Sequence, residues 1–262
     1  MTMLQLVVLA VVQGITEFLP ISSEGHLIIT SQVLGWPDQG LAIDLATNAG
    51  TLAAVIVFFR RDLIALLAGL GERGSQSTRP LVGMLIVATI PAGLIGLLLD
   101  SIGHEHLRQT WIIATTTLVF GVVLWLADRY GMTLRRVEHM TWGSAIFIGL
   151  AQVLALIPGT SRSGITMSAA RIMGFEREAA ARFSLLLSIP LIAAAVLLGV
   201  LKIREAGDAA LTGSALLVAA ISFVTALIAL AAMMAWLRRA SFTPFVIYRL
   251  LLGTGLLLWL YA

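Results

Sequence analysis

Six apolar segments, each close to the length of a membrane-spanning helix, leave this chain few ways to fold. A helix needs ~20 apolar residues to cross hydrocarbon, because its backbone polar groups must be satisfied inside the segment. Only 12% of the residues are charged, about half the share usual in soluble domains. We therefore expect an all-α polytopic membrane protein that forms one integral membrane domain over residues 1–262. The segments are 41–59, 80–99, 111–127, 177–200, 212–237 and 243–261.

The N-terminal stretch is apolar but interrupted. Met3 to Phe18 is predicted to be a helix, and Pro20 cannot continue it. Ser22 or Ser23 can cap a second, short helix that reaches about Gly35. Broken backbone at membrane depth is tolerated only where protein or water surrounds it. We therefore predict a re-entrant helical hairpin here.

A second interrupted stretch, 142–174, is broken at Pro158-Gly159 and is predicted to form a second re-entrant hairpin. The order is then a hairpin and three spans, followed by a hairpin and three spans. Because three is odd, the second half must enter the membrane with the opposite orientation. This layout is an inverted-topology repeat, with repeat one at about 1–128 and repeat two at about 140–262, and its binding site is expected near the midplane.

The basic residues support this topology. If the loop 60–79 faces the cytoplasm, the loops and flanks on that side carry twelve arginines and the outer loops carry three basic residues. The split follows the positive-inside rule and places both termini outside. The inner residues are Arg60, Arg61, Arg73, Arg79, Arg129, Arg135, Arg136, Arg171, Arg177, Arg182, Arg238 and Arg239, and the outer ones are Arg108, Lys202 and Arg204.

Gln13 and Glu17 are the first polar pair at membrane depth. They lie four residues apart on one helix face, one turn before the break. Two oxygen ligands placed in this way can bind a hard divalent cation, which usually shares its coordination with substrate phosphates. The alternative is a glutamate that only hydrogen-bonds the broken backbone. A carboxylate at this depth favours the metal.

Ser22, Ser23 and His26 follow at the break. Ser23 and His26 are three residues apart and share a helix face, and a hydroxyl beside an imidazole is the minimum for an activated nucleophile. The alternative is that the serines only cap the helix and the histidine bonds a carbonyl. Glu24 could be a third metal ligand or a general base, but a carboxylate at a helix N-terminus is stabilised anyway, so we favour a position facing water.

The second hairpin offers Ser161, Arg162, Ser163 and Thr166 at a helix start. Hydroxyls, one guanidinium and free backbone N–H groups together bind phosphate. The alternative is an arginine that snorkels to the membrane interface. The Pro-Gly break directly before it argues against this, since a straight helix would suffice for snorkelling.

Four further polar residues at membrane depth leave two alternatives open each. Asp44, Asn48 and Thr51 share one face of the first span, where they either line a cavity or bond across helices. Arg249 either pairs with a carboxylate of the site or lies near the cytoplasmic end of its span.

The chain has no cysteine, which excludes disulfides, thiol nucleophiles and thiolate metal sites.

These motifs resemble the two signature motifs of the undecaprenyl-diphosphate phosphatase family, known also as bacitracin resistance proteins. The similarity extends over the whole chain in length, hydropathy and hairpin placement. Gln13 stands where the family has its first glutamate, a variation the family allows, and Glu24 stands where a small hydroxyl residue is common. The matching stretches are Gln13-x-x-x-Glu17, Pro20-x-Ser22-Ser23-x-Gly25-His26, Pro158-Gly159-x-Ser161-Arg162-Ser163-Gly164-x-Thr166, Arg60-Arg61 and Pro244-Phe245-x-Ile247-Tyr248-Arg249.

The resemblance implies hydrolysis of undecaprenyl diphosphate to undecaprenyl phosphate and inorganic phosphate, which recycles the lipid carrier of cell-wall synthesis. It implies a divalent metal ion, Mg²⁺ or Ca²⁺, on Glu17 and Gln13, and catalysis by Glu17, Ser23, His26 and Arg162. It places the reaction at the outer face of the bacterial inner membrane, with membrane lipid as partner, no nucleic acid, and a homodimer left open. The implied phosphate-binding residues are Ser22, Gly25, Ser161, Ser163, Gly164 and Thr166.

Two questions stay open from the sequence. The nucleophile could be Ser23, His26 or an activated water. The alternative function is a polyprenyl-phosphate flippase or another anion or lipid transporter, because inverted repeats with paired broken helices are common in transporters. A nucleophile beside the anion site, which transport does not need, favours the phosphatase.

Overall fold

The computed structural model describes residues 1–36, 40–70, 79–103, 105–205 and 213–262, and within them it is helical, without an extended strand. Six helices are long and apolar enough to cross a membrane, which confirms the predicted all-α polytopic fold. Each lies within a few residues of a predicted segment. They are α3 (Gly40–Phe58), α5 (Arg79–Ile102), α6 (Thr110–Tyr130), α9 (Arg177–Glu205), α10 (Gly213–Leu237) and α11 (Thr243–Tyr261).

Shorter helices fill the two interrupted stretches and the turns, and both breaks lie where the prolines and glycines predict them. One helix end differs from the prediction, since the first helix stops at Thr16 and not at Phe18. The helices are α1 (Met3–Thr16), α2 (Ser23–Leu34), α4 (Arg60–Leu70), α7 (Trp142–Gln152) and α8 (Arg162–Ile172), and the 3₁₀ helices are η1 (Glu105–Arg108), η2 (Val137–His139) and η3 (Val153–Leu156).

Helix α4 was not predicted, because the charges of Arg60, Arg61 and Asp62 suggested a loop. The chain instead continues almost directly from α3, and the Leu63 N–H donates to the Phe59 carbonyl across the junction at 2.9 Å. Leu66 is buried, so one apolar face is enough to hold the helix against the bundle.

Both hairpins break with the same unusual backbone geometry. Ser22 and Ser161 have φ values of 73° and 71°, and they are the only non-glycine residues with positive φ in the described chain. Each hydroxyl oxygen accepts the N–H of a glycine three residues later, Gly25 at 3.4 Å and Gly164 at 3.1 Å. A non-glycine residue held there costs about 1–3 kcal/mol, and such strain gathers at functional sites.

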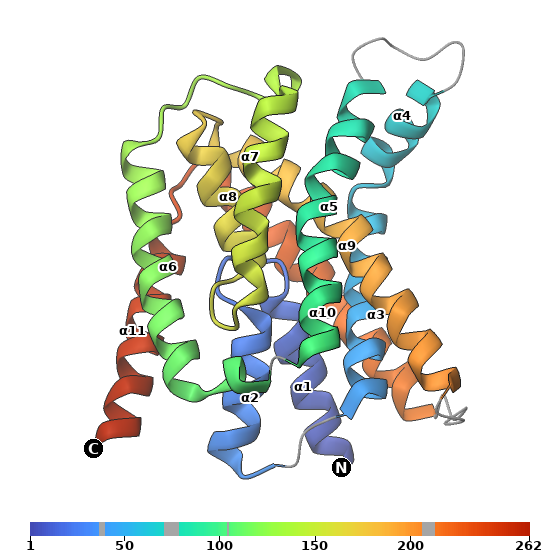
Figure 1. Cartoon of the computed structure of the whole chain (residues 1–262), viewed down its shortest axis with the longest axis vertical. Helices are drawn as coiled ribbons and strands as arrows, with labels where there is room; N and C mark the ends of the chain where they lie inside the picture. The colour runs from blue at the N-terminus through green and yellow to red at the C-terminus, as the bar shows by residue number, and fades with distance from the viewer. Residues whose placement is uncertain (37–39, 71–78, 104, 206–212) are drawn as a thin grey trace.

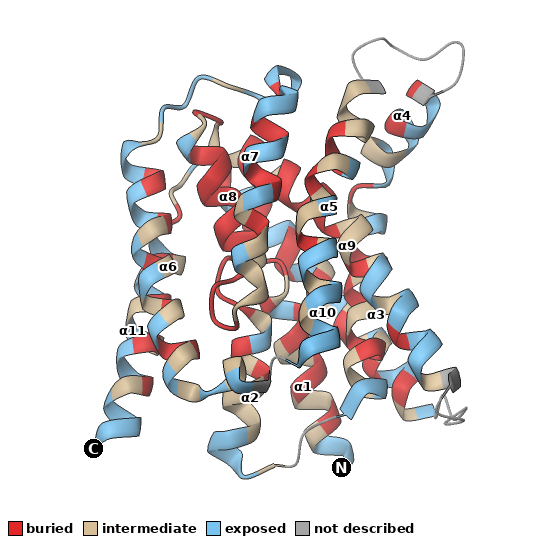
Figure 2. Ribbon diagram, in the orientation of Figure 1, coloured by how far each residue is buried: buried red, intermediate tan, exposed pale blue. Residues whose placement is uncertain are grey.

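The two hairpins meet in the middle of the molecule. In Figure 1, α1 and α2 rise from the end where both termini lie, and α7 and α8 descend from the opposite end, so that their connecting loops come together. Figure 2 shows buried residues concentrated on these loops, on α8 and on the inner helix faces, while exposed residues lie along the outside. The broken backbone is therefore surrounded by protein, as its polar groups require.

The helices around the hairpins pack in equivalent pairs: α1 lies against α10 and α7 against α5, and α3 contacts α9 while α6 contacts α11. Glycines allow both hairpin contacts. A Cβ at Gly14 would lie 2.7 Å from the Ser222 carbonyl oxygen, and one at Gly149 would lie 2.6 Å from that of Ala88. This pairing is compatible with the inverted repeat, which stays a prediction, as do the repeat boundaries and the re-entrant placement of the hairpins.

Arg171 departs from the sequence analysis, which placed it among the basic loop flanks. Its side chain is 1% exposed, and its Nε lies 3.3 Å from Asp128 Oδ1. Arg177 Nε is 2.7 Å from the same oxygen, and Asp128 Oδ2 accepts the Phe242 N–H at 3.1 Å. This buried cluster ties α6, α8, α9 and the start of α11 together. Arg73, another of the twelve inner arginines, lies outside the described residues.

Candidate active site

The buried side chain of Arg249 holds the two hairpin loops together. Its Nη1 donates to the carbonyl oxygens of Pro20 at 3.1 Å and Thr160 at 3.0 Å, and its Nη2 donates to that of Gly159 at 3.0 Å. Its Nε donates to the Thr117 carbonyl on α6 at 3.1 Å. Neither predicted position is therefore correct, because the guanidinium binds backbone carbonyls and not a carboxylate, and it lies fully buried at the centre.

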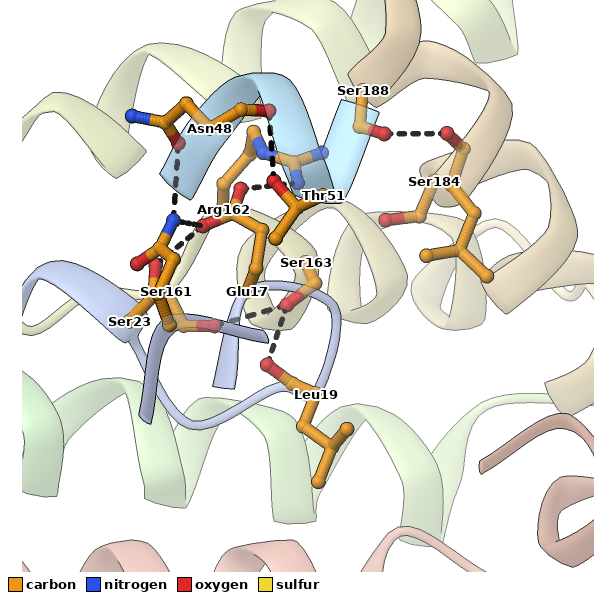
Figure 3. A network of polar contacts seen from close by, with 12 residues as sticks. Glu17, Leu19, Ser23, Asn48, Thr51, Ser161, Arg162, Ser163, Ser184 and Ser188 are labelled. Carbon is orange, nitrogen blue, oxygen red and sulfur yellow. Dashed lines mark hydrogen bonds and ion pairs between the residues drawn. The ribbon is translucent and has the colours of Figure 1, made fainter. Parts of the chain in front are cut away.

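Directly beside this joint, both hairpins contribute to a polar cluster around Glu17 (Figure 3). Glu17 Oε1 is 3.2 Å from Arg162 Nη2, and these side chains are 10% and 13% exposed. Glu17 Oε2 accepts hydrogen bonds from Ser23 Oγ at 2.6 Å and Gln13 Nε2 at 3.0 Å. Gln13 Nε2 also donates to Asn48 Oδ1 on α3 at 3.0 Å. The cluster therefore joins a carboxylate of one hairpin to a guanidinium of the other.

Two buried atoms of this cluster have no hydrogen-bond partner among the described residues. They are the acceptor Gln13 Oε1 and the donor Arg162 Nη1. Leaving such an atom unsatisfied costs about 1–3 kcal/mol, and more for a charged group. The pairing of Arg162 with Glu17 at low exposure also contradicts the snorkelling alternative. The cluster thus keeps one unused acceptor and one unused cationic donor close to Glu17.

A cavity of about 300 Å³ opens beside the cluster. It resolves the alternatives for the α3 residues, because Asp44 and Asn48 line it, and Asn48 also bonds across helices to Gln13. Thr51 does neither, since its hydroxyl donates to the Asn48 carbonyl within α3. The lining residues are Gln13, Glu17, Ser23, Glu24, Leu27, Asp44, Asn48 and Arg108.

His26 is not directed at Ser23. Its Nδ1 is 2.6 Å from the Ser22 carbonyl oxygen, and its Nε2 is 2.5 Å from the hydroxyl of Tyr248 on α11. The Ser23 hydroxyl donates to Glu17 instead. The carboxylate, and not the imidazole, is therefore the hydrogen-bond partner of Ser23 in this structure.

The hydroxyls of the second hairpin form hydrogen bonds with backbone groups. Ser161 caps α8 through the Gly164 N–H, and Ser163 donates to the Leu19 carbonyl of the first hairpin at 2.8 Å (Figure 3). Thr166 donates to the Arg162 carbonyl at 2.8 Å. All three side chains are buried and, like Arg162, none of them lines the cavity. Of the predicted phosphate ligands on this hairpin, Arg162 is the one that reaches the cluster.

Gly25 and Gly164 allow close approach at the joint. A Cβ at Gly25 would lie 3.2 Å from Ile113 Cγ2, and one at Gly164 would lie 3.0 Å from Arg249 Nη1. Ser22 caps α2 through the Gly25 N–H. These residues shape the two loops on which Glu17, Ser23 and Arg162 depend.

The cluster fits a metal ion in part. No group of three His, Asp or Glu side chains able to hold a metal occurs in the described part of the chain. Glu17 and the unpartnered Gln13 Oε1 supply two oxygen ligands, and Mg²⁺ is commonly held by one or two protein ligands with phosphate and water in the remaining positions. Asp44 and Glu24 add carboxylates to the same cavity. These donors fit a hard cation that reaches the site together with a phosphate ligand.

Two residues on α11 were missed as site residues by the sequence analysis. Tyr248 contacts His26 across 222 residues of sequence, and Arg249 contacts both loops. An arginine at membrane depth without an acidic neighbour was the available signal for Arg249, because such a charge must find partners. For Tyr248 the signal was its place in the stretch from Pro244 to Arg249 that resembles the family, which assigned it no role.

Comparison with known proteins gives one family. A family model described as bacitracin resistance protein BacA matches residues 6–255. An undecaprenyl-diphosphatase of Hahella chejuensis is 51% identical, with all of both chains covered. One of Alcanivorax borkumensis is 49% identical over 98% of each chain, and undecaprenyl-diphosphatase 1 of Pseudoalteromonas translucida is 44% identical over 99% of each.

The hydrogen bonds of Arg249 to the hairpin loops predict that this side chain stabilises the folded protein. Arg249→Lys keeps the charge but cannot reach carbonyls on three segments, so at least two bonds to a charged donor are lost. Each is worth about 1.5–3 kcal/mol, and we expect a loss of roughly 3 kcal/mol or more. Thermal unfolding in detergent measures it, with Arg239→Lys, an exposed arginine, as the matched control. Equal unfolding temperatures of the two variants would show that the joint is not needed for folding.

Proposed function

The chain belongs to the family of bacitracin resistance proteins and is an undecaprenyl-diphosphatase, and from this premise we propose that it hydrolyses its substrate where the two hairpins meet. The products are undecaprenyl phosphate and inorganic phosphate. The proposed site consists of Glu17, Ser23 and Arg162, with Gln13 beside them. The alternative of a transporter has no separate observation in its favour.

The observation that most supports this proposal is the unpaired Nη1 donor of Arg162. Its Nη2 is engaged by Glu17, whereas its Nη1 is buried without a partner. A guanidinium can form paired hydrogen bonds to two oxygens of one phosphate. A terminal phosphate that reaches the cluster would satisfy Nη1, and it would then lie close to Ser23.

Ser23 is the group best placed to attack the terminal phosphorus. Ser23 lines the cavity, and its Oγ lies 2.6 Å from Glu17 Oε2, so the carboxylate can take the hydroxyl proton as the bond to phosphorus forms. The bond between this phosphorus and the bridging oxygen breaks, and undecaprenyl phosphate leaves. Water then hydrolyses the phosphoserine, which releases inorganic phosphate and restores the hydroxyl. Arg162 stabilises the charge on the transferred phosphoryl oxygens throughout.

Glu17 and Gln13 Oε1 would hold the divalent cation, Mg²⁺ or Ca²⁺. When bound, such an ion supplies positive charge to diphosphate oxygens and so complements Arg162. Without it, the guanidinium of Arg162 pairs with Glu17. A cation held there would offset the charge of the phosphate, so that the two together would add little net charge to a largely buried site.

The protein is a multi-pass membrane protein, and we propose the bacterial inner membrane with the cavity open to the outer side. The twelve-to-three division of basic residues supports this orientation. Arg108 and Glu24 line the cavity, and the chain between α5 and α6 that carries Arg108 is predicted to lie outside. Membrane lipid and the lipid substrate are the partners, and a homodimer stays a prediction.

Substitution of Arg162 tests the phosphate clamp. Arg162→Ala should lower the rate of phosphate release roughly a hundred- to a thousandfold, the usual effect of removing a preorganised donor from a developing anion. Arg162→Lys should also lose more than about tenfold, since an ammonium cannot bridge two oxygens. Initial rates at saturating lipid measure this, with Arg239→Lys as control. A Lys variant within about twofold of wild type, well below the 1.36 kcal/mol of a tenfold change, would exclude the clamp.

Substitution of Glu17 tests the metal and the base together. Glu17→Gln should lower the rate by roughly a hundredfold or more, because the amide is a poor proton acceptor and a weaker ligand for a hard cation. Calorimetric titration with Mg²⁺ in the presence of a non-hydrolysable prenyl diphosphate should show weaker metal binding. Glu138→Gln, an exposed carboxylate outside the cavity, is the control. Unchanged rate and metal affinity would make Glu17 purely structural.

The orientation has a direct test, because the chain lacks cysteine. Ser101 and Thr133 are exposed, and they lie at the ends of α5 and α6 that the charge division assigns to opposite sides. Cysteine at Ser101 should react with an impermeant maleimide added to intact spheroplasts, and cysteine at Thr133 should react only after lysis. The reverse pattern would contradict the proposed orientation, and labelling of both from one side would contradict the topology.

A further inference from the structure

His26 is held between a backbone carbonyl and a tyrosine from the far end of the chain. Its Nδ1 is 2.6 Å from the Ser22 carbonyl oxygen, and its Nε2 is 2.5 Å from the Tyr248 hydroxyl oxygen. The two rings are nearly parallel but laterally offset, with centroids 5.5 Å apart and planes inclined by 10°. Both ring nitrogens are therefore engaged.

These partners determine where the proton of a neutral His26 lies. A carbonyl oxygen can only accept a hydrogen bond, so Nδ1 carries the hydrogen. Nε2 then has the lone pair, and the phenol, which keeps its proton at neutral pH, donates to it. The basic nitrogen of His26 is thus Nε2, and it faces α11.

The geometry points to Tyr248 as a positioning residue for this reaction: we propose that its hydroxyl holds His26 in one rotamer and one tautomer, with Nε2 basic. The inference rests on the catalytic part that the resemblance to the family implies for His26, which comes in addition to the site proposed above. Tyr248 does not line the cavity beside Glu17, so it acts through the imidazole. Its neighbour Arg249 holds the loops, so α11 supports both parts of the site.

Tyr248 restricts His26 through its hydrogen bond and not through close packing. Tyr248 is 42% exposed and is not part of the closely packed interior, so its packing alone contributes little. Its hydroxyl nevertheless restricts His26 from the side opposite the Ser22 carbonyl. If the phenol were absent, Nε2 would lose its donor and the ring could turn about its side-chain torsions. The Ser22 carbonyl would then be the sole fixed partner of the imidazole.

The kinetic test separates positioning from substrate binding. Tyr248→Phe keeps the aromatic ring and removes only the donor. We expect kcat to fall about tenfold with KM within about twofold, because the Ser22 carbonyl still holds Nδ1, whereas a fully misplaced catalytic histidine loses roughly 10⁴-fold. Tyr261→Phe on the same helix is the control, since Tyr261 is 77% exposed, and it should match wild type.

A spectroscopic readout makes the inference independent of the rate. The chain has four histidines, so nitrogen-15 spectra of histidine-labelled protein, with His26→Ala for assignment, identify the His26 signals. In wild type they should report a neutral ring with hydrogen on Nδ1, and in Tyr248→Phe they should shift towards a mixture of tautomers.

Three results would overturn the inference. One is hydrogen on Nε2 of His26 in the wild-type spectrum, which decides the matter even if Tyr248→Phe fails to fold. Another is a Tyr248→Phe variant whose kcat and His26 signals both equal those of wild type. The third is full activity of His26→Ala, which removes His26 from the reaction while leaving Glu17, Ser23 and Arg162 as the proposed site.

Discussion

The hydrogen bonds from Arg249 to the hairpin loops are the interaction on which the rest of the molecule depends. The two hairpin loops lie in the middle of the protein, and buried loop carbonyls must find hydrogen-bond partners outside any helix. A guanidinium without a counter-ion has the complementary difficulty, because a buried charge needs several hydrogen bonds. The guanidinium and the carbonyls satisfy each other. The Arg249 side chain donates to the carbonyls of Pro20 on the first loop, Gly159 and Thr160 on the second, and Thr117 on α6.

The position of the reactive groups follows from this joint. Glu17 shortly precedes Pro20, and Arg162 shortly follows Thr160, so fixing the two carbonyls fixes the distance between carboxylate and guanidinium. The Ser163 hydroxyl adds a second tie through the Leu19 carbonyl. Preorganised charges of this kind stabilise a transition state without reorganisation during the reaction. The ion pair of Glu17 and Arg162 is thus a result of how the loops are held, and not its cause.

Sequence reasoning recovered the parts of this protein that depend on local signals. The six spans follow from apolar length and the breaks from Pro20 and Pro158-Gly159. Among the polar residues singled out at the breaks, Glu17, Ser23 and Arg162 lie in one cluster. It could not recover contacts between a side chain and distant backbone. Every residue carries a backbone carbonyl, so the sequence does not indicate which carbonyl will be the partner. Arg249 and the buried hydroxyls of Ser161, Ser163 and Thr166 belong to this class. The pairing of His26 with Tyr248 required a register between α2 and α11 that no pattern in either segment encodes.

The choice of main-chain atoms as the partners of Arg249 has a consequence for how such a chain can vary. A joint made to carbonyl oxygens does not depend on the side chains of the residues that supply them, so the loops can exchange residues freely as long as their backbone path survives. The two hairpins turn with nearly the same φ at Ser22 and Ser161. One nevertheless presents a carboxylate and the other a guanidinium. Two loops with the same turn can in this way carry opposite charges without disturbing the framework that brings them together.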